Sequence, residues 1–136
     1  MRISAHLNFD GTCAEAFRFY QRVLGGTLPT MLTYGESALA EHTPEHLRHR
    51  IVHATLAFAG YELLGADVMP QAYERPAGFS VLFNAGAVEK AQQIFVAFSE
   101  GGQVRLPFAP TFWSPGFGVV VDRFGTPWEV DSEVAQ

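Results

Sequence analysis

The chain has 136 residues, a length that suits one compact domain, and 48% of the residues are apolar, enough for a substantial core. The net charge is −5 and the basic residues are scattered, so we exclude nucleic acid as the main partner. A single cysteine, Cys13, cannot form an internal disulfide. With no signal-peptide pattern and no membrane-spanning apolar stretch, the sequence predicts a cytoplasmic protein without membrane attachment.

The first predicted elements are a strand and a helix. Residues 3–9 alternate apolar and polar side chains, which is typical of a strand with one buried face. A helix is predicted to follow, because Thr12 and Glu15 have the spacing of a capping box and apolar residues then recur at helical intervals. Gly25-Gly26 is expected to end the helix, since glycine tolerates the left-handed conformation there.

Three further strands complete the first half, over residues 27–34, 51–58 and 61–66, and the last two form a hairpin that turns at Ala59-Gly60. The polar segment 35–50 contains His42, His46 and His49. It is predicted to form a short helix near residues 44–47 or a mobile loop. We predict that the three histidines belong to a lid that covers a ligand-binding cleft, and that they do not bind a metal.

The second half repeats this order after a proline-containing linker. We predict a strand over 79–83, a helix over 86–99 that ends at Gly101-Gly102, and strands over 103–107, 117–122 and 127–131. The whole chain, 1–136, is thus predicted to be a single domain built from two βαβββ modules, 1–67 and 78–132.

This pattern predicts an α+β fold. The helix of each module covers one face of its sheet, so the other face has to pack on something or line a cavity. Two such curved mixed sheets side by side would enclose a cleft, a common place for a small-molecule site.

Two segments carry a resemblance to a known family. The run from Leu7 to Tyr20, LNFDGTCAEAFRFY, closed by Val23-Leu24-Gly25-Gly26, and the ending Val121 to Trp128, VDRFGTPW, resemble the PhnB-like branch of the vicinal-oxygen-chelate superfamily. Glyoxalase I, bleomycin-resistance proteins and extradiol dioxygenases are relatives. The resemblance implies a homodimer. Some members are described as demethylubiquinone methyltransferases, but the sequence has no glycine-rich nucleotide loop that would support this activity.

The resemblance also implies candidate metal ligands. Enzymes of the superfamily hold a divalent metal (Fe, Mn, Ni or Zn) with His and Glu side chains from strands. The matching positions are His6, His53 and Glu129, with Glu129 also the catalytic candidate. The alternative for His6 is a side chain that faces solvent or lines a cavity. His53 could instead be a general base or a hydrogen-bonded side chain of the cleft, and Glu129 a carboxylate that pairs with an arginine or faces water. Glu62 is in reserve, although counting from the hairpin glycines makes Leu64 the repeat partner of Glu129.

Further residues are candidates for binding the substrate. The aromatic and proline-rich segment around residues 107–115 could form the wall of a pocket for a flat or apolar ligand, or pack across a dimer interface. The full set of substrate-binding candidates is Asn8, Glu62, Phe108, Phe112, Trp113 and Trp128.

The sequence allows three functions, of which the first two are favoured equally. The first is a metal-dependent lyase, isomerase or dioxygenase that acts on a small oxygen-bearing molecule. The second is a metal-free dimer that binds and sequesters a small molecule such as a drug. The third is a vestigial cleft, with dimer formation itself as the function.

Overall fold

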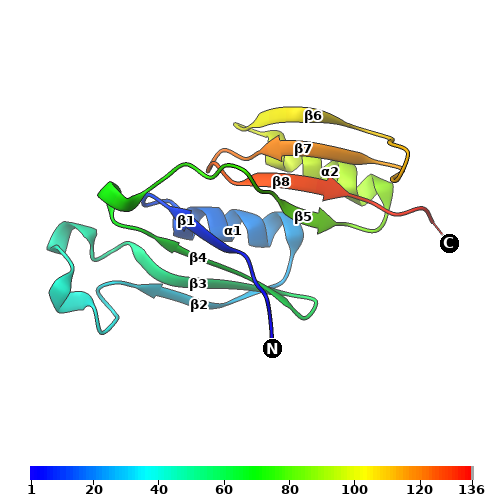
Figure 1. Ribbon diagram of the computed structural model, residues 1–136. Coiled ribbons are helices and arrows are strands. Elements are labelled where there is room, and N and C mark those ends of the chain that lie inside the picture. The colour runs from blue at the N-terminus through cyan, green and yellow to red at the C-terminus, as the bar shows by residue number, and fades with distance from the viewer. Residues whose placement is uncertain (136) are drawn as a thin grey trace. The chain divides into compact units, whose positions relative to one another are not determined.

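The structure is a computed structural model that describes residues 1–135. The chain divides into two compact units, Met1–Glu74 and Arg75–Gln136 (Figure 1). Each unit has the element order βαβββ, with the helix lying along one face of a four-stranded sheet. The predicted α+β fold of two βαβββ repeats is therefore confirmed, while the cleft between the sheets stays a prediction.

The first unit contains one helix and four strands. They are β1 (His6–Phe9), α1 (Cys13–Leu24), β2 (Thr27–Thr33), β3 (Ile51–Phe58) and β4 (Tyr61–Asp67). The strand order is β1-β4-β3-β2, with β1 parallel to β4 and the other pairs antiparallel. The first strand is shorter than predicted, since Ile3 is fully exposed and lies outside it.

The second unit repeats this topology. Its elements are β5 (Val81–Asn84), α2 (Val88–Ser99), β6 (Gln103–Ala109), β7 (Phe117–Val121) and β8 (Pro127–Asp131), with the strand order β5-β8-β7-β6. Strand β5 is parallel to β8, and the other two pairs are antiparallel. No helix within residues 1–135 is both long and apolar enough to cross a membrane.

The glycine pairs end both helices as predicted, but the four glycines act differently. Gly25 and Gly26 have φ values of +90° and +87°, and Gly101 has a φ of +70°. Residues with a side chain rarely adopt this backbone conformation. Gly102 does not have a positive φ. It has to be glycine because a Cβ there would lie 2.4 Å from the backbone oxygen of Val121.

Each helix packs on one sheet face, here called the helix face. In the first unit, Phe17 of α1 contacts Phe9 of β1 edge-on, with ring centroids 6.1 Å apart. In the second unit, Phe98 of α2 stacks on Trp128 of β8 at 4.5 Å. Side chains alternate along a strand, so neighbours such as Asn8 and Glu129 lie on the opposite face, here called the open face.

Strand pairing corrects the predicted repeat partner of Glu129. Glu129 pairs with Leu82 of β5, which directly precedes the helix-facing Phe83. The equivalent position in β1 is Asn8, which directly precedes Phe9 and pairs with Ala66. Ala66 is therefore the partner and the choice of Leu64 was wrong. The first hairpin has a two-residue turn and the second a five-residue loop, so an alignment on the hairpin glycines slips.

The polar segment 35–50 forms a closed loop with two short 3₁₀ turns, η1 (Ala40–His42) and η2 (Glu45–Leu47); a third, η3 (Pro70–Ala72), follows β4. Two backbone hydrogen bonds join the ends of the loop. The N–H of Tyr34 donates to the carbonyl of Arg50, and the N–H of Gly35 donates to the carbonyl of Arg48, both at 2.9 Å. Leu47 is buried inside the loop. Its three histidines, His42, His46 and His49, are all exposed.

Candidate functional site

The open face of the first unit carries the predicted polar residues of that half. His6 pairs with Leu64 of β4, and Leu64 pairs with Thr55 of β3, so these three form one row across the sheet. His53 lies two residues from Thr55 on the same face. Both histidines are exposed. Within residues 1–135, neither side chain forms a hydrogen bond with another side chain.

The two histidines do not converge on one point. Strand β4 lies between β1 and β3, and His53 is displaced by two residues along β3, so the two Cα atoms are about 12 Å apart. Side chains standing off a sheet keep such a spacing, whereas two nitrogens on one ion lie within about 4 Å of each other. Across residues 1–135, no three His, Cys, Asp or Glu side chains form a group that could hold a metal ion.

Asn8 and Glu62 share this open face with the histidines. Asn8 is exposed and pairs with Ala66. Glu62 pairs with Ala57. Its Oε1 forms an ion pair with Nη1 of Arg2 at 3.2 Å, and this contact is open to solvent. The open face of the first unit thus carries four polar side chains, from His6, Asn8, His53 and Glu62, beside Leu64.

The open face of the second unit has a different character. Glu129 lies half-buried on the central strand β8, flanked by Leu82 and Val119, and Leu106 extends the row onto β6. No hydrogen bond or ion pair to the Glu129 carboxylate occurs within residues 1–135. This side chain is a lone carboxylate in an apolar row.

Three aromatic side chains extend this face, here called the aromatic ladder: Phe112, Trp113 and Phe117. Phe112 meets Trp113 edge-on at 4.8 Å, and Trp113 meets Phe117 at 5.2 Å. Phe117 anchors the ladder on β7, two residues from Val119 and on the same face. Phe112 is 97% exposed and Trp113 is 54% exposed, so the upper part of the ladder is open to solvent.

The other two predicted aromatic contacts lie on the helix face. Phe108 packs against Phe95 of α2 at 5.7 Å. Trp128 is 1% exposed, stacks on Phe98, and donates from Nε1 to Oδ2 of Asp122 at 2.9 Å. Trp128 is a core residue and Phe108 is half-buried against α2, so both side chains lie on the face opposite Glu129. Strand alternation was the available signal, because Trp128 and Glu129 are adjacent and have to face opposite ways.

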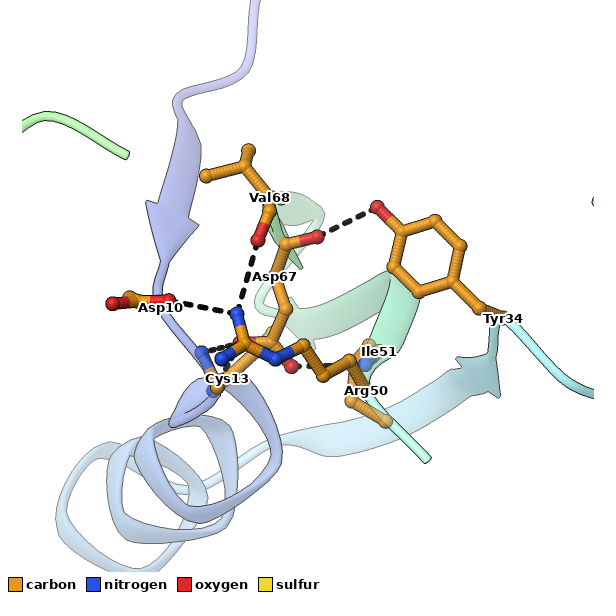
Figure 2. A network of polar contacts seen from close by, with 8 residues as sticks. Asp10, Cys13, Tyr34, Arg50, Ile51, Asp67 and Val68 are labelled. Atoms are coloured by element: carbon orange, nitrogen blue, oxygen red, sulfur yellow. Dashed lines mark hydrogen bonds and ion pairs between the residues drawn. The ribbon is translucent and has the colours of Figure 1, made fainter. Parts of the chain in front are cut away.

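A buried carboxylate that the sequence analysis did not single out organises the first unit. Asp67, 1% exposed at the end of β4, accepts backbone N–H bonds from Gly11 at 2.8 Å and Cys13 at 3.0 Å through Oδ1, and from Ile51 at 2.8 Å through Oδ2. Figure 2 shows this network. Asp67 thus joins β4, the start of α1 and the start of β3.

Asp67 also replaces the predicted capping box. The Thr12 side chain makes no capping hydrogen bond, so that prediction was wrong. The carboxylate of Asp67 instead accepts from the N–H of Cys13, the first residue of α1, where the helix dipole favours an anion, and from the N–H of Gly11 in the preceding turn. A residue 54 positions away in sequence therefore caps this helix.

Polar contacts around Asp67 hold the base of the 35–50 loop in place. The Tyr34 hydroxyl donates to the backbone oxygen of Asp67 at 2.7 Å. The Arg50 guanidinium donates to Oδ1 of Asp10 at 2.7 Å and to the backbone oxygen of Val68 at 3.1 Å (Figure 2). Both ends of the loop are thereby fixed to the end of β4.

Two groups beside Asp67 have perturbed pKa values. Burial raises the pKa of the Cys13 thiol far above its ordinary value, and the nearby Asp67 charge adds to the effect. Burial and Asp67 also raise the pKa of the Tyr34 hydroxyl, partly offset by Arg50. Cys13 is thus a neutral thiol within the core, which does not suit a nucleophile.

Known proteins with this topology place the chain in a structural class. A protein from Burkholderia phytofirmans described as a glyoxalase/bleomycin resistance protein/dioxygenase family enzyme has a TM-score of 0.65 at 12% identity, covering 96% of this chain and 97% of its own. The PhnB protein from Bacillus cereus, described as a putative 3-demethylubiquinone-9 3-methyltransferase, has a TM-score of 0.81 at 20% identity, covering 97% and 99%. These likenesses show the glyoxalase/bleomycin-resistance fold.

Closer relatives show the family. Residues 1–131 match the family described as 3-demethylubiquinone-9 3-methyltransferase, and the chain belongs to this PhnB-like family. Protein YjdN from Escherichia coli K12 is 32% identical over 139 residues, covering 96% of this chain and 95% of YjdN. The crystal structure of PA1353 from Pseudomonas aeruginosa is 39% identical with a TM-score of 0.90, covering 98% of both chains.

Proposed function

We propose that this protein binds a small molecule with a flat or apolar body on the open face of its second unit, and that it does so without a bound metal. The observation that carries the proposal is the exposed pair Phe112 and Trp113, of which Trp113 meets Phe117 edge-on beside an apolar row of the sheet. Exposed neighbouring apolar side chains are typical of binding surfaces. Aromatic rings add stacking contacts for a flat ligand.

A thermal-shift screen of small aromatic compounds tests this proposal, because a ligand that binds only the folded protein raises its melting temperature. Trp113→Ala should remove the shift produced by a hit. Tyr61→Ala is the matched control, since Tyr61 is an exposed aromatic side chain on the first unit. A hit whose shift survives Trp113→Ala would place the ligand elsewhere and refute the proposed site.

We also propose that the protein is a homodimer, as its resemblance to PhnB-like proteins implies, and that it is cytoplasmic, since a single free cysteine suits a reducing compartment. The ladder could then belong to the subunit interface instead of a ligand site. Light scattering coupled to gel filtration distinguishes the two roles. Conversion of a dimer to a monomer by Trp113→Ala, with ligand-induced shifts retained, would assign the ladder to the interface.

The alternative function is a metal-dependent lyase, isomerase or dioxygenase, with His6, His53 and Glu129 as ligands. This centre has less support than the metal-free site, because no three His, Cys, Asp or Glu side chains within residues 1–135 form a group that could hold a metal ion, and the Cα atoms of His6 and His53 are about 12 Å apart on their sheet. We therefore propose no step through a metal.

Metal analysis of protein purified without a His tag tests this choice. We expect far less than one divalent ion per chain. A near-stoichiometric ion that is lost in Glu129→Gln would overturn the metal-free proposal and support the enzyme. The methyl transfer in the family's description finds no support in this sequence, which has no glycine-rich nucleotide loop between a strand and a helix.

A further inference from the structure

We infer that the ligand of the aromatic ladder carries a positive charge, such as an amine or a quaternary ammonium group attached to an apolar or aromatic body. This inference rests on the proposed function and names the chemical class of its ligand. It starts from the position of Glu129 relative to the ladder. Glu129 pairs with Val119, and Phe117 lies two residues further along the same strand and face.

This geometry puts the carboxylate beside the ladder. Residues in diagonal positions on adjacent strands are about 7–8 Å apart, which is within reach of a long or aromatic side chain. A molecule that stacks on the exposed Trp113 and extends past the buried Phe117 over the sheet will therefore also cover Glu129. The flanking residues Leu82 and Val119 offer it no hydrogen-bonding group.

Covering Glu129 determines what the ligand has to contain. Removing an ionised carboxylate from water is costly unless a cation or a hydrogen-bond donor replaces the water. No side chain within residues 1–135 supplies such a group to Glu129. Strands β5, β7 and β8 contain no Lys, Arg or His, and the one arginine of this sheet, Arg105, lies at an irregular position of the edge strand β6.

The ladder favours the same charge. The faces of Trp and Phe rings attract cations, and quaternary ammonium groups are bound in this way by aromatic side chains. A carboxylate beside exposed rings thus offers both a counter-charge and a stacking surface. An anionic ligand would meet repulsion from Glu129, and a neutral one would leave the carboxylate without a partner.

Three probes that differ in charge test the inference: benzyltrimethylammonium, benzyl alcohol and phenylacetate. Their binding to the full chain is followed by tryptophan fluorescence, because Trp113 is half-exposed while Trp128 is buried. We expect the cation to bind about five- to tenfold more tightly than the alcohol, and phenylacetate to bind most weakly. Added salt should weaken binding of the cation and leave binding of the alcohol unchanged.

Two variants remove the same charge at different places. Glu129→Gln should reduce the preference for the cation over the alcohol to less than twofold. Glu89→Gln, an exposed position in the first turn of α2, should leave the preference unchanged. Trp113→Phe should remove the fluorescence response to all probes, since only the buried Trp128 then remains.

The outcomes separate this inference from the proposed function. Equal affinity for the cation and the alcohol, with a response that depends on Trp113, would overturn the charge inference while the ladder remains a binding site. A preference for the cation that persists in Glu129→Gln would also overturn it. Failure of all three probes to bind would overturn the proposed function, and this inference with it.

Discussion

Substitution of Asp67 by asparagine is the sharpest test of how the first unit is held together. The Asp67 carboxylate is buried and accepts three backbone N–H groups, from Gly11, Cys13 and Ile51. In Asp67→Asn, one oxygen becomes an NH₂ group. If the remaining oxygen keeps Gly11 and Cys13, the new NH₂ faces the N–H of Ile51, and two donors oppose each other in the core.

The expected cost follows from these contacts. A buried donor without an acceptor costs about 1–3 kcal/mol, and the two remaining bonds each weaken by about 1 kcal/mol when the acceptor loses its charge. We expect the free energy of unfolding to fall by about 3–5 kcal/mol. For a chain of this size, that lowers the melting temperature by about 10–20 °C.

Urea unfolding followed by circular dichroism measures this loss, and Asp10→Asn is the matched control. The Asp10 side chain is 44% exposed in its ion pair with Arg50, so its replacement should cost at most about 1 kcal/mol. Hydrogen exchange adds a local measurement, because the amides of Gly11, Cys13 and Ile51 should lose protection in Asp67→Asn. A loss of stability no larger than that of Asp10→Asn would refute the assigned role of Asp67.

Three further predictions concern the same core and its repeat. The raised pKa of Cys13 means that the folded state favours the protonated thiol, so stability should be complete below the unfolded-state pKa near 9.0 and fall by up to about 1.4 kcal/mol per pH unit above it. Urea titrations at pH 8 and pH 10 should show this decline in the native protein and a smaller one in Cys13→Ala; equal declines would contradict the assignment. Tyr34→Phe removes the 2.7 Å bond to the backbone oxygen of Asp67 and should cost about 1 kcal/mol, with faster hydrogen exchange at the base of the 35–50 loop; unchanged exchange there would be contrary to expectation. Gly102→Ala should destabilise the chain by more than 1 kcal/mol in the same urea assay, because its Cβ would collide with a backbone oxygen, whereas Ala87→Gly, an exposed position before α2, serves as a mild control; a cost of only a few tenths would argue against that close approach.

The elements and their repeated order were predictable because they depend on neighbours in sequence. Alternation along residues 3–9 and 127–131 indicates strands, and the glycine pairs after residues 24 and 100 indicate helix ends. The match of the chain's two ends to PhnB-like proteins predicted the family. These signals need only the period of the backbone and the conformational freedom of glycine.

The residues of the proposed site could be predicted only in part. Glu129, Phe112 and Trp113 do lie on the second unit as a carboxylate and an exposed aromatic pair. Phe108 and Trp128 were grouped with them although they pack on the helix face. The sequence shows which of these residues are aromatic. The sheet face on which each side chain lies depends on its position along the strand and on a register shift in β6 between Leu106 and Ala109.

Local pattern thus determined which segments are helices and strands and that they form two copies of one unit. The tertiary structure alone decided that Asp67, not Thr12, caps the first helix, and that Ala66, not Leu64, is the counterpart of Glu129. The physical reason is that both outcomes depend on the register between strands that are distant in sequence. A carboxylate finds its donors, and a side chain its neighbours, only after those strands have paired.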